Sequence, residues 1–223
     1  MTHTIVHVMR HGEVHNPEGV LYARLPGFSL SQLGFQMAQK GADFFTEHGS
    51  DIAVVKASPL LRAQQTALPT AKAYGLEVQS DPRLIEAANV FEGQSLHRDR
   101  SVLWRNGNWK YLLNPLRPSW GEPFTAQVDR MRAAVSDVID EAWGRQALLV
   151  SHQLPIWLLR SFAEGRPLVH DPRKRECALA SVTTLHFDEH TLVGVEYAEP
   201  SASLMAQATD MTPGASKAAV NKG

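Results

Sequence analysis

The sequence predicts an α/β fold, namely a three-layer α/β/α sandwich with a largely parallel central sheet and an antiparallel edge. Short apolar runs alternate with amphipathic stretches of helical spacing, which is the pattern of parallel strands connected by helices. The apolar runs lie at 5–9, 52–57 and 147–150. Two later runs, 181–187 and 192–197, flank a polar turn and therefore predict a terminal antiparallel pair.

Length and composition indicate a single domain over residues 1–200. The chain of 223 residues is long enough for one sizeable core, and 43% of its residues are hydrophobic. A formal net charge of −1 argues against binding to nucleic acid, so any anion site must be a local concentration of positive charge. No apolar run approaches the roughly 18 residues of a membrane span, and we expect no membrane association.

Cysteine usage and the N-terminus predict the cellular compartment. The single cysteine, Cys177, cannot form a disulfide within the chain. The first residues lack the basic and then apolar pattern of a secretory signal, so we expect a cytoplasmic protein. The oligomeric state is left open.

The first two helices are predicted from their capping residues. Ser31 is an N-cap candidate and Gly49 a C′ candidate, so one helix lies between them. Ser58-Pro59 is the N-cap and N1 arrangement of a second helix over 60–74. Pro69 lies inside that helix and predicts a kink or a break.

The second half of the chain contains two more helices and two segments of unusual composition. An apolar stripe predicts a helix over 125–143, and Pro155 opens another that ends near residue 164. Residues 97–124 interleave basic and aromatic side chains, which predicts a lid-like insertion or, alternatively, a peripheral excursion packed on the body. Residues 201–223 form a low-complexity tail that we expect to be disordered or loosely attached.

Two of the apolar runs end in a histidine. Arg10-His11 follows the first run and precedes Gly12, and Ser151-His152 follows the run at 147–150. Because open α/β sheets bind ligands outside the carboxyl ends of their strands, both imidazoles should face one crevice. A neutral imidazole is a competent nucleophile toward phosphorus, so His11 can carry a transient phosphoryl group.

The stretch Arg10-His11-Gly12-Glu13 resembles the signature of the histidine phosphatase (phosphoglycerate mutase-like) superfamily. Residues 58–67, Ser-Pro-Leu-Leu-Arg-Ala-Gln-Gln-Thr-Ala, resemble its second motif position by position, and Ser151-His152 is similar to its third. The resemblance covers about residues 4–199. It implies a phosphoglycerate mutase-like fold and chemistry on a phosphate ester.

Three positive groups are expected around the phosphoryl group. Arg10 and Arg62 supply planar forks that match phosphate oxygens, and protonated His152 would add a third cation. At about 4 Å and an effective dielectric near 20, each contact is worth on the order of 4 kcal/mol before desolvation. No metal is then required, and we expect no cofactor. The spacing of His7, His11 and His15 would form a metal-ligand row only on a helix, whereas their neighbours favour a strand.

The resemblance assigns further roles. Glu86 occupies the position of the superfamily's proton donor, and burial would give its carboxyl group the raised pKa that this role demands. Glu13 is interpreted as structural, bonding loop backbone or an arginine. The superfamily's phosphate-binding asparagine commonly lies one position after Asn16, so Asn16 contacts phosphate only if the loop shifts. Gln153 stands where a glycine is usual, and it would narrow the pocket or bind substrate.

We therefore predict a metal-independent phosphomonoester hydrolase that acts on a small phosphorylated metabolite through a phosphohistidine at His11. Phosphoglycerate mutase-type phosphoryl transfer is the alternative within the superfamily. A non-catalytic sensor of a phosphate ligand is the alternative in another functional class. The sequence does not identify the substrate.

Overall fold

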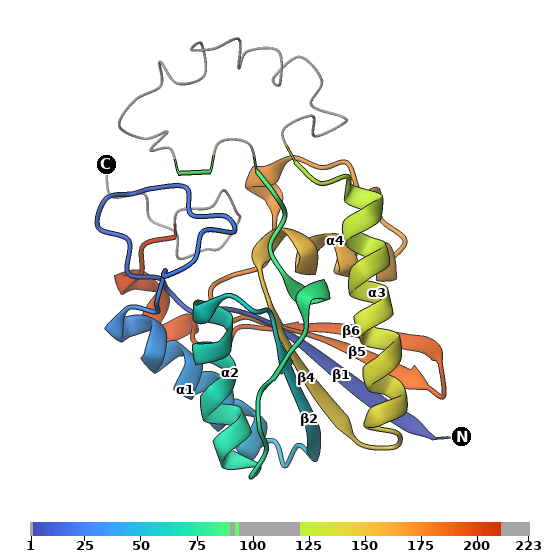
Figure 1. Cartoon of the computed structure of the whole chain (residues 1–223). Coiled ribbons are helices and arrows are strands. Elements are labelled where there is room, and N and C mark those ends of the chain that lie inside the picture. The colour runs from blue at the N-terminus through green and yellow to red at the C-terminus, as the bar shows by residue number, and fades with distance from the viewer. Residues whose placement is uncertain (1, 90–91, 94–120, 211–223) are drawn as a thin grey trace.

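Within the residues that the computed structural model describes, 2–89, 92–93 and 121–210, six strands form one central sheet (Figure 1). The strands are β1 (His3–Arg10), β2 (Ile52–Ala57), β3 (Gln79–Ser80), β4 (Gln146–Ser151), β5 (Val182–Asp188) and β6 (Thr191–Ala198). Their spatial order is β3-β2-β4-β1-β5-β6. The first four are parallel, and β5 pairs antiparallel with both β1 and β6. The predicted sheet is confirmed.

Helices cover both faces of this sheet and complete the three predicted layers (Figure 1). The helices α1 (Gln32–Glu47) and α2 (Leu61–Ala73) pack on one face, and α3 (Phe124–Glu141) and α4 (Gln153–Ala163) pack on the other. No helix in the described ranges is long and apolar enough to span a membrane.

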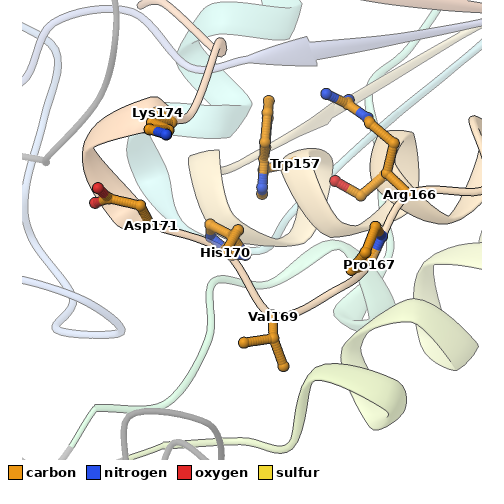
Figure 2. Close-up of a pocket in the computed structure, with 8 residues that line it drawn as sticks. Trp157, Arg166, Pro167, Val169, His170, Asp171 and Lys174 are labelled. Atoms are coloured by element: carbon orange, nitrogen blue, oxygen red, sulfur yellow. The ribbon is translucent and has the colours of Figure 1, made fainter.

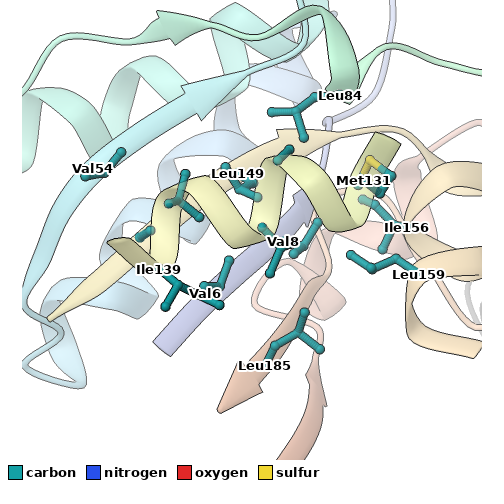
Figure 3. Close-up of a cluster of buried hydrophobic side chains, with 14 of the residues drawn as sticks. Val6, Val8, Val54, Leu84, Met131, Ile139, Leu149, Ile156, Leu159 and Leu185 are labelled. Atoms are coloured by element: carbon teal, nitrogen blue, oxygen red, sulfur yellow. The ribbon is translucent and has the colours of Figure 1, made fainter. Parts of the chain in front are cut away.

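The core is divided between the two faces by the alternation of side chains along each strand. In β1, Val6 and Val8 point toward α3 and α4, whereas Met9 points toward α1 and α2. Figure 3 shows the first cluster, in which Met131 and Ile139 of α3 pack on the strands. The predicted apolar stripe of α3 is therefore the face that covers the sheet.

Local capping signals fix the ends of α1 as predicted. Ser31 is the N-cap, and its Oγ accepts a hydrogen bond from the Gly34 backbone N–H at 2.9 Å. Gly49 follows the helix with a φ of 62°, a left-handed conformation that glycine adopts without steric cost.

The N-terminal ends of α2 and α4 differ from the predictions. Helix α2 begins at Leu61, with Leu60 as an N-cap that has no side-chain cap bond. The Ser58 hydroxyl bonds His152 and accepts from the Leu60 N–H at 3.4 Å. The helix also continues through Pro69 without a break, held by three alanines of its buried face, Ala63, Ala67 and Ala71. Helix α4 begins two residues before Pro155, which is tolerated in a first turn because the N–H groups there have no helical acceptor.

The expectation of a loose tail beyond residue 200 is wrong for residues 201–210. A 3-10 helix, η5 (Ala202–Gln207), places Met205 in the core cluster beneath α1 and α2. The Ser201 hydroxyl donates to the Leu179 carbonyl at 2.9 Å. Burial of one large side chain outweighs the low-complexity composition here. Residues 211–223, and residues 97–120 of the predicted insertion, lie outside the described part of the chain.

Candidate active site

Three adjacent parallel strands place the candidate site at their carboxyl ends. The backbone ladder continues past the strands, where the His11 N–H donates to the Ser151 carbonyl at 3.1 Å and the Ser58 N–H donates to the Val150 carbonyl at 2.9 Å. The rings of His11 and His152 therefore lie together, with 5.1 Å between their centroids. This is the juxtaposition that the two strand ends predicted.

The hydrogen bond of His11 defines which nitrogen can react. Its Nδ1 lies 2.8 Å from the Gly12 carbonyl oxygen, and a carbonyl can only accept, so Nδ1 carries the proton. The lone pair is then on Nε2. Burial lowers the pKa of His11 well below its usual value, and the charges of Arg62 and Arg10 lower it further. The imidazole is neutral and nucleophilic.

His152 is held by a serine that the sequence had suggested as a helix cap. Its Nε2 lies 2.8 Å from Ser58 Oγ, and its Nδ1 is buried without a hydrogen-bond partner among the described residues. Burial lowers the pKa of His152 well below its usual value, with a further contribution from Arg62. Two cations and a dry environment disfavour a charge on His152, so the protonated His152 expected beside a phosphoryl group stays a prediction.

Arg62 is positioned entirely by neutral groups. One terminal nitrogen donates to the Ala23 carbonyl at 2.6 Å, and the guanidinium carbon lies 4.7 Å from the ring centroid of Tyr22. Its Nε is buried without a partner among the described residues. Burial lowers the pKa of Arg62, and the charges of Glu86 and Glu92 oppose this shift without offsetting it.

Arg10 is bound by a carboxylate from the far end of the chain. Its two terminal nitrogens form a bidentate pair with Asp210 at 2.8 and 2.9 Å, and one also donates to the Cys177 carbonyl at 2.6 Å. Burial disfavours the charge, yet Asp210 more than offsets this effect and raises the pKa of Arg10. The Asp210 side chain is itself only 4% exposed. No sequence signal identified Asp210, which lay in the supposed tail.

Glu86 carries a carboxyl group whose affinity for a proton is enhanced. Burial raises its pKa, although the Ala87 backbone N–H, which donates to it at 2.8 Å, and nearby arginines partly oppose the rise. Its segment is anchored to the site because Arg24 donates to the Glu86 carbonyl at 2.6 Å and Ser151 Oγ donates to the Leu84 carbonyl at 2.7 Å. The environment is the one expected of a general acid.

Close backbone packing and one hydroxyl lock the loop after β1. A Cβ atom on Gly12 would lie 2.6 Å from the Gly34 carbonyl oxygen of α1, so only glycine fits there. The Gly12 N–H donates to Thr66 Oγ1 at 3.1 Å, and that hydroxyl donates to the Arg62 carbonyl at 2.7 Å. Thr66 thus ties the loop that carries His11 to the helix that carries Arg62.

Residues 6–200 match the histidine phosphatase superfamily (branch 1). The chain belongs to this superfamily. The uncharacterized protein Rv0525 of Mycobacterium tuberculosis is 50% identical over 200 residues, which are 89% of this chain and 98% of that relative. The probable phosphoglycerate mutase GpmB of Yersinia pestis is 32% identical over 188 residues, 79% of this chain and 83% of the relative.

A solved structure confirms the fold class. The mycobacterial glucosyl-3-phosphoglycerate phosphatase Rv2419c has a TM-score of 0.69 and 22% identity, covering 88% of this chain and 98% of that one. Proteins similar to this chain thus include phosphatases and phosphoglycerate mutase-like proteins.

Two polar residues of the histidine phosphatase signature loop make structural contacts. The Asn16 amide donates to the Val20 carbonyl at 2.8 Å and accepts from the Val20 N–H at 3.1 Å, so it closes the loop on itself. Glu13 bonds the Ser31 hydroxyl and accepts from the Thr209 backbone N–H at 2.7 Å. The interpretation of Glu13 as structural is confirmed, whereas a phosphate contact of Asn16 stays a prediction.

A separate cavity of about 350 Å³ lies beside α4 and contains none of these site residues (Figure 2). It is lined by Trp157, Val169 and His170, among others. In the described part of the chain, no group of three or more His, Cys, Asp or Glu side chains is arranged to hold a metal ion.

Proposed function

We propose that this protein is a metal-independent phosphomonoester hydrolase that forms a phosphohistidine at His11. The observation that carries the proposal is the hydrogen bond from His11 Nδ1 to the Gly12 carbonyl, which leaves a lone pair on Nε2 of a neutral imidazole. The substrate is a small-molecule phosphomonoester.

The reaction divides into two displacements at phosphorus. His11 Nε2 attacks the phosphoryl group, the bond between phosphorus and the ester oxygen breaks, and Glu86 gives its proton to the departing oxygen. Water then attacks the phosphohistidine and gives a proton back to Glu86, and the bond between nitrogen and phosphorus breaks. The enzyme is regenerated, and inorganic phosphate leaves.

The arginines supply the positive charge that this mechanism needs. Arg10 and Arg62 both lie within electrostatic reach of His11, because the charge of each lowers its pKa. An arginine fork binds phosphate oxygens in a bidentate geometry, and preorganised charge of this kind stabilises a phosphoryl transition state. A phosphate dianion would also favour protonation of His152, whose Nδ1 has no described partner.

Phosphoryl transfer between substrate positions is the second candidate, favoured by the similarity to the probable phosphoglycerate mutase GpmB. Both reactions share the phosphohistidine and differ in whether water or a substrate hydroxyl accepts the phosphoryl group. A sensor that only binds phosphate is less well supported, because nucleophile, cations and acid are all present in one site.

The test measures turnover and labelling in the same protein. We expect His11→Ala to abolish release of phosphate from a panel of phosphomonoesters, and we expect the wild type to form an acid-labile, alkali-stable phosphoryl adduct. His15→Ala removes an exposed histidine of the same loop and serves as the control. Near-normal turnover by His11→Ala would refute the mechanism, and isomerised phosphate ester without phosphate release would indicate a mutase.

A further inference from the structure

Arg175 is a third guanidinium near the site, half-buried, and two neutral side chains hold it. Its Nε donates to His170 Nε2 at 2.8 Å, and one terminal nitrogen lies 3.4 Å from Gln153 Oε1. His170 Nδ1 lies 2.6 Å from the Leu168 carbonyl, so Nδ1 carries the proton and Nε2 is free to accept from Arg175. Figure 2 shows His170 beside α4.

Arg175 differs from the nearby Arg160 and Arg173 in that no carboxylate among the described residues is hydrogen-bonded to it. Within the described residues, Arg160 bonds Glu164 and Arg173 bonds Asp171, whereas the bonds of Arg175 go to an imidazole and an amide. Burial lowers the pKa of Arg175 to about 10, so the group is still charged at neutral pH. A desolvated cation held only by neutral acceptors is poised to bind an anion.

The contact with Gln153 places Arg175 on the His152 side of the site. The main cations that act on His11, the proposed nucleophile, are Arg62 and Arg10. Arg175 acts, together with these two arginines, on Glu86, the proposed proton donor to the departing oxygen. Gln153, which bonds the guanidinium of Arg175, directly follows His152 in the chain.

We propose that Arg175, oriented by His170 and Gln153, is a subsite for a second anionic group on the part of the substrate that departs from phosphorus. The group is a carboxylate or a second phosphoryl group. This inference rests on the proposed function and specifies its substrate class. Gln153 is then a positioning residue for the subsite rather than an obstruction of the phosphate pocket.

The test compares Arg175→Met with Arg173→Met on three substrates of similar size. Arg173 is the matched control, because it is two residues away and its side chain is 84% exposed. Glycerol 3-phosphate has no second anion, 3-phosphoglycerate carries a carboxylate, and propane-1,3-diol bisphosphate carries a second phosphate. The last two distinguish the two kinds of anion.

We expect the wild type to prefer at least one of the doubly anionic substrates. Arg175→Met should lower kcat/KM for that substrate by about 10- to 100-fold, the loss expected for a hydrogen bond to a charged group. It should change glycerol 3-phosphate hydrolysis by no more than about 3-fold, because the phosphate pocket is untouched. Gln153→Ala should weaken the preference less, because it removes only the orientation of the fork.

Three results would overturn the subsite. An equal loss on all three substrates would make Arg175 a ligand of the transferred phosphate. A rise in the pH at which kcat/KM declines, equal on all substrates, would make it only a modulator of the pKa of Glu86. Absence of any preference in the wild type would remove the second anion altogether. Failure of the proposed function itself would be seen separately, as no phosphorylation of His11 by glycerol 3-phosphate.

Discussion

Arg10 and Arg62 are equally buried, each 1% exposed, yet their pKa values shift in opposite directions. Asp210 binds the fork of Arg10 and raises its pKa, whereas the fork of Arg62 contacts a carbonyl and an aromatic ring and its pKa is lowered by burial. Burial alone therefore does not identify an arginine that is free to bind phosphate. A phosphate that uses both terminal nitrogens of Arg10 must first displace Asp210.

The largest expected effects follow from replacing each arginine by methionine, and the two variants should differ in how well residues 201–210 stay in place. Arg62→Met should lower kcat/KM on every phosphomonoester by about 10²- to 10³-fold, as expected when a preorganised donor to the reacting group is removed. Arg10→Met should cause a similar loss and, in addition, loosen residues 201–210, because the buried bidentate pair between Arg10 and Asp210 is lost. Hydrogen exchange at the Thr209 amide would detect this loosening, and equal protection in both variants would contradict the difference.

A smaller effect should follow from weakening the carboxylate that competes for Arg10. Asp210→Asn replaces a charged acceptor by a neutral one, so inorganic phosphate should inhibit about 10-fold more tightly, since hydrogen bonds between ions are roughly twice as strong as neutral ones. Asp188→Asn is the control, because Asp188 pairs with His3 in the sheet and not with Arg10. Weaker inhibition by phosphate would show instead that Asp210 positions Arg10 for binding.

The pH dependence of kcat/KM should shift in opposite directions in the Arg62→Met and Asp210→Asn variants. Burial raises the pKa of Glu86, and kcat/KM for an alkyl phosphate should fall as the pH rises through that pKa, because the proton donor is lost. Arg62→Met removes a cation that lowers this pKa, so the fall should occur at higher pH. Asp210→Asn removes a carboxylate charge that opposes the charge of Arg10, so the fall should occur at lower pH. If the fall moves in the same direction in both variants, Asp210 does not weaken the effect of the Arg10 charge on the pKa of Glu86.

The smallest expected effect follows from removing the ring of Tyr22, which contacts Arg62. Tyr22→Leu removes the ring that lies 4.7 Å from the Arg62 guanidinium. A cation–π contact of this kind is worth about 0.5–1 kcal/mol, so KM should rise about 2- to 5-fold with little change in kcat. Tyr22→Phe keeps the ring and should behave like the wild type. A similar rise in both variants would assign the effect to the hydroxyl group.

The sequence by itself determined the features that depend on neighbouring residues. Apolar runs that end in polar residues located β1 and β4, and with them His11 and His152, because strand periodicity and the change from core to crevice are both local. The Ser31 cap and the buried stripe of α3 were predictable for the same reason. Glu86 and Arg62 came from motif resemblance, since a single carboxylate or arginine has no local signal of its role.

Only the tertiary structure decided which groups share a hydrogen bond across the chain. Asp210 reaches Arg10 from 200 positions away, and Ser58 serves His152 rather than the start of α2. The Asn16 amide bonds the backbone of Val20 within its own loop. Each outcome is a competition between partners of comparable strength, and the distances that settle it exist only after the sheet has formed. Met205 packs in the core cluster, and no local pattern in residues 201–210 predicted this packing or the bond from Asp210 to Arg10.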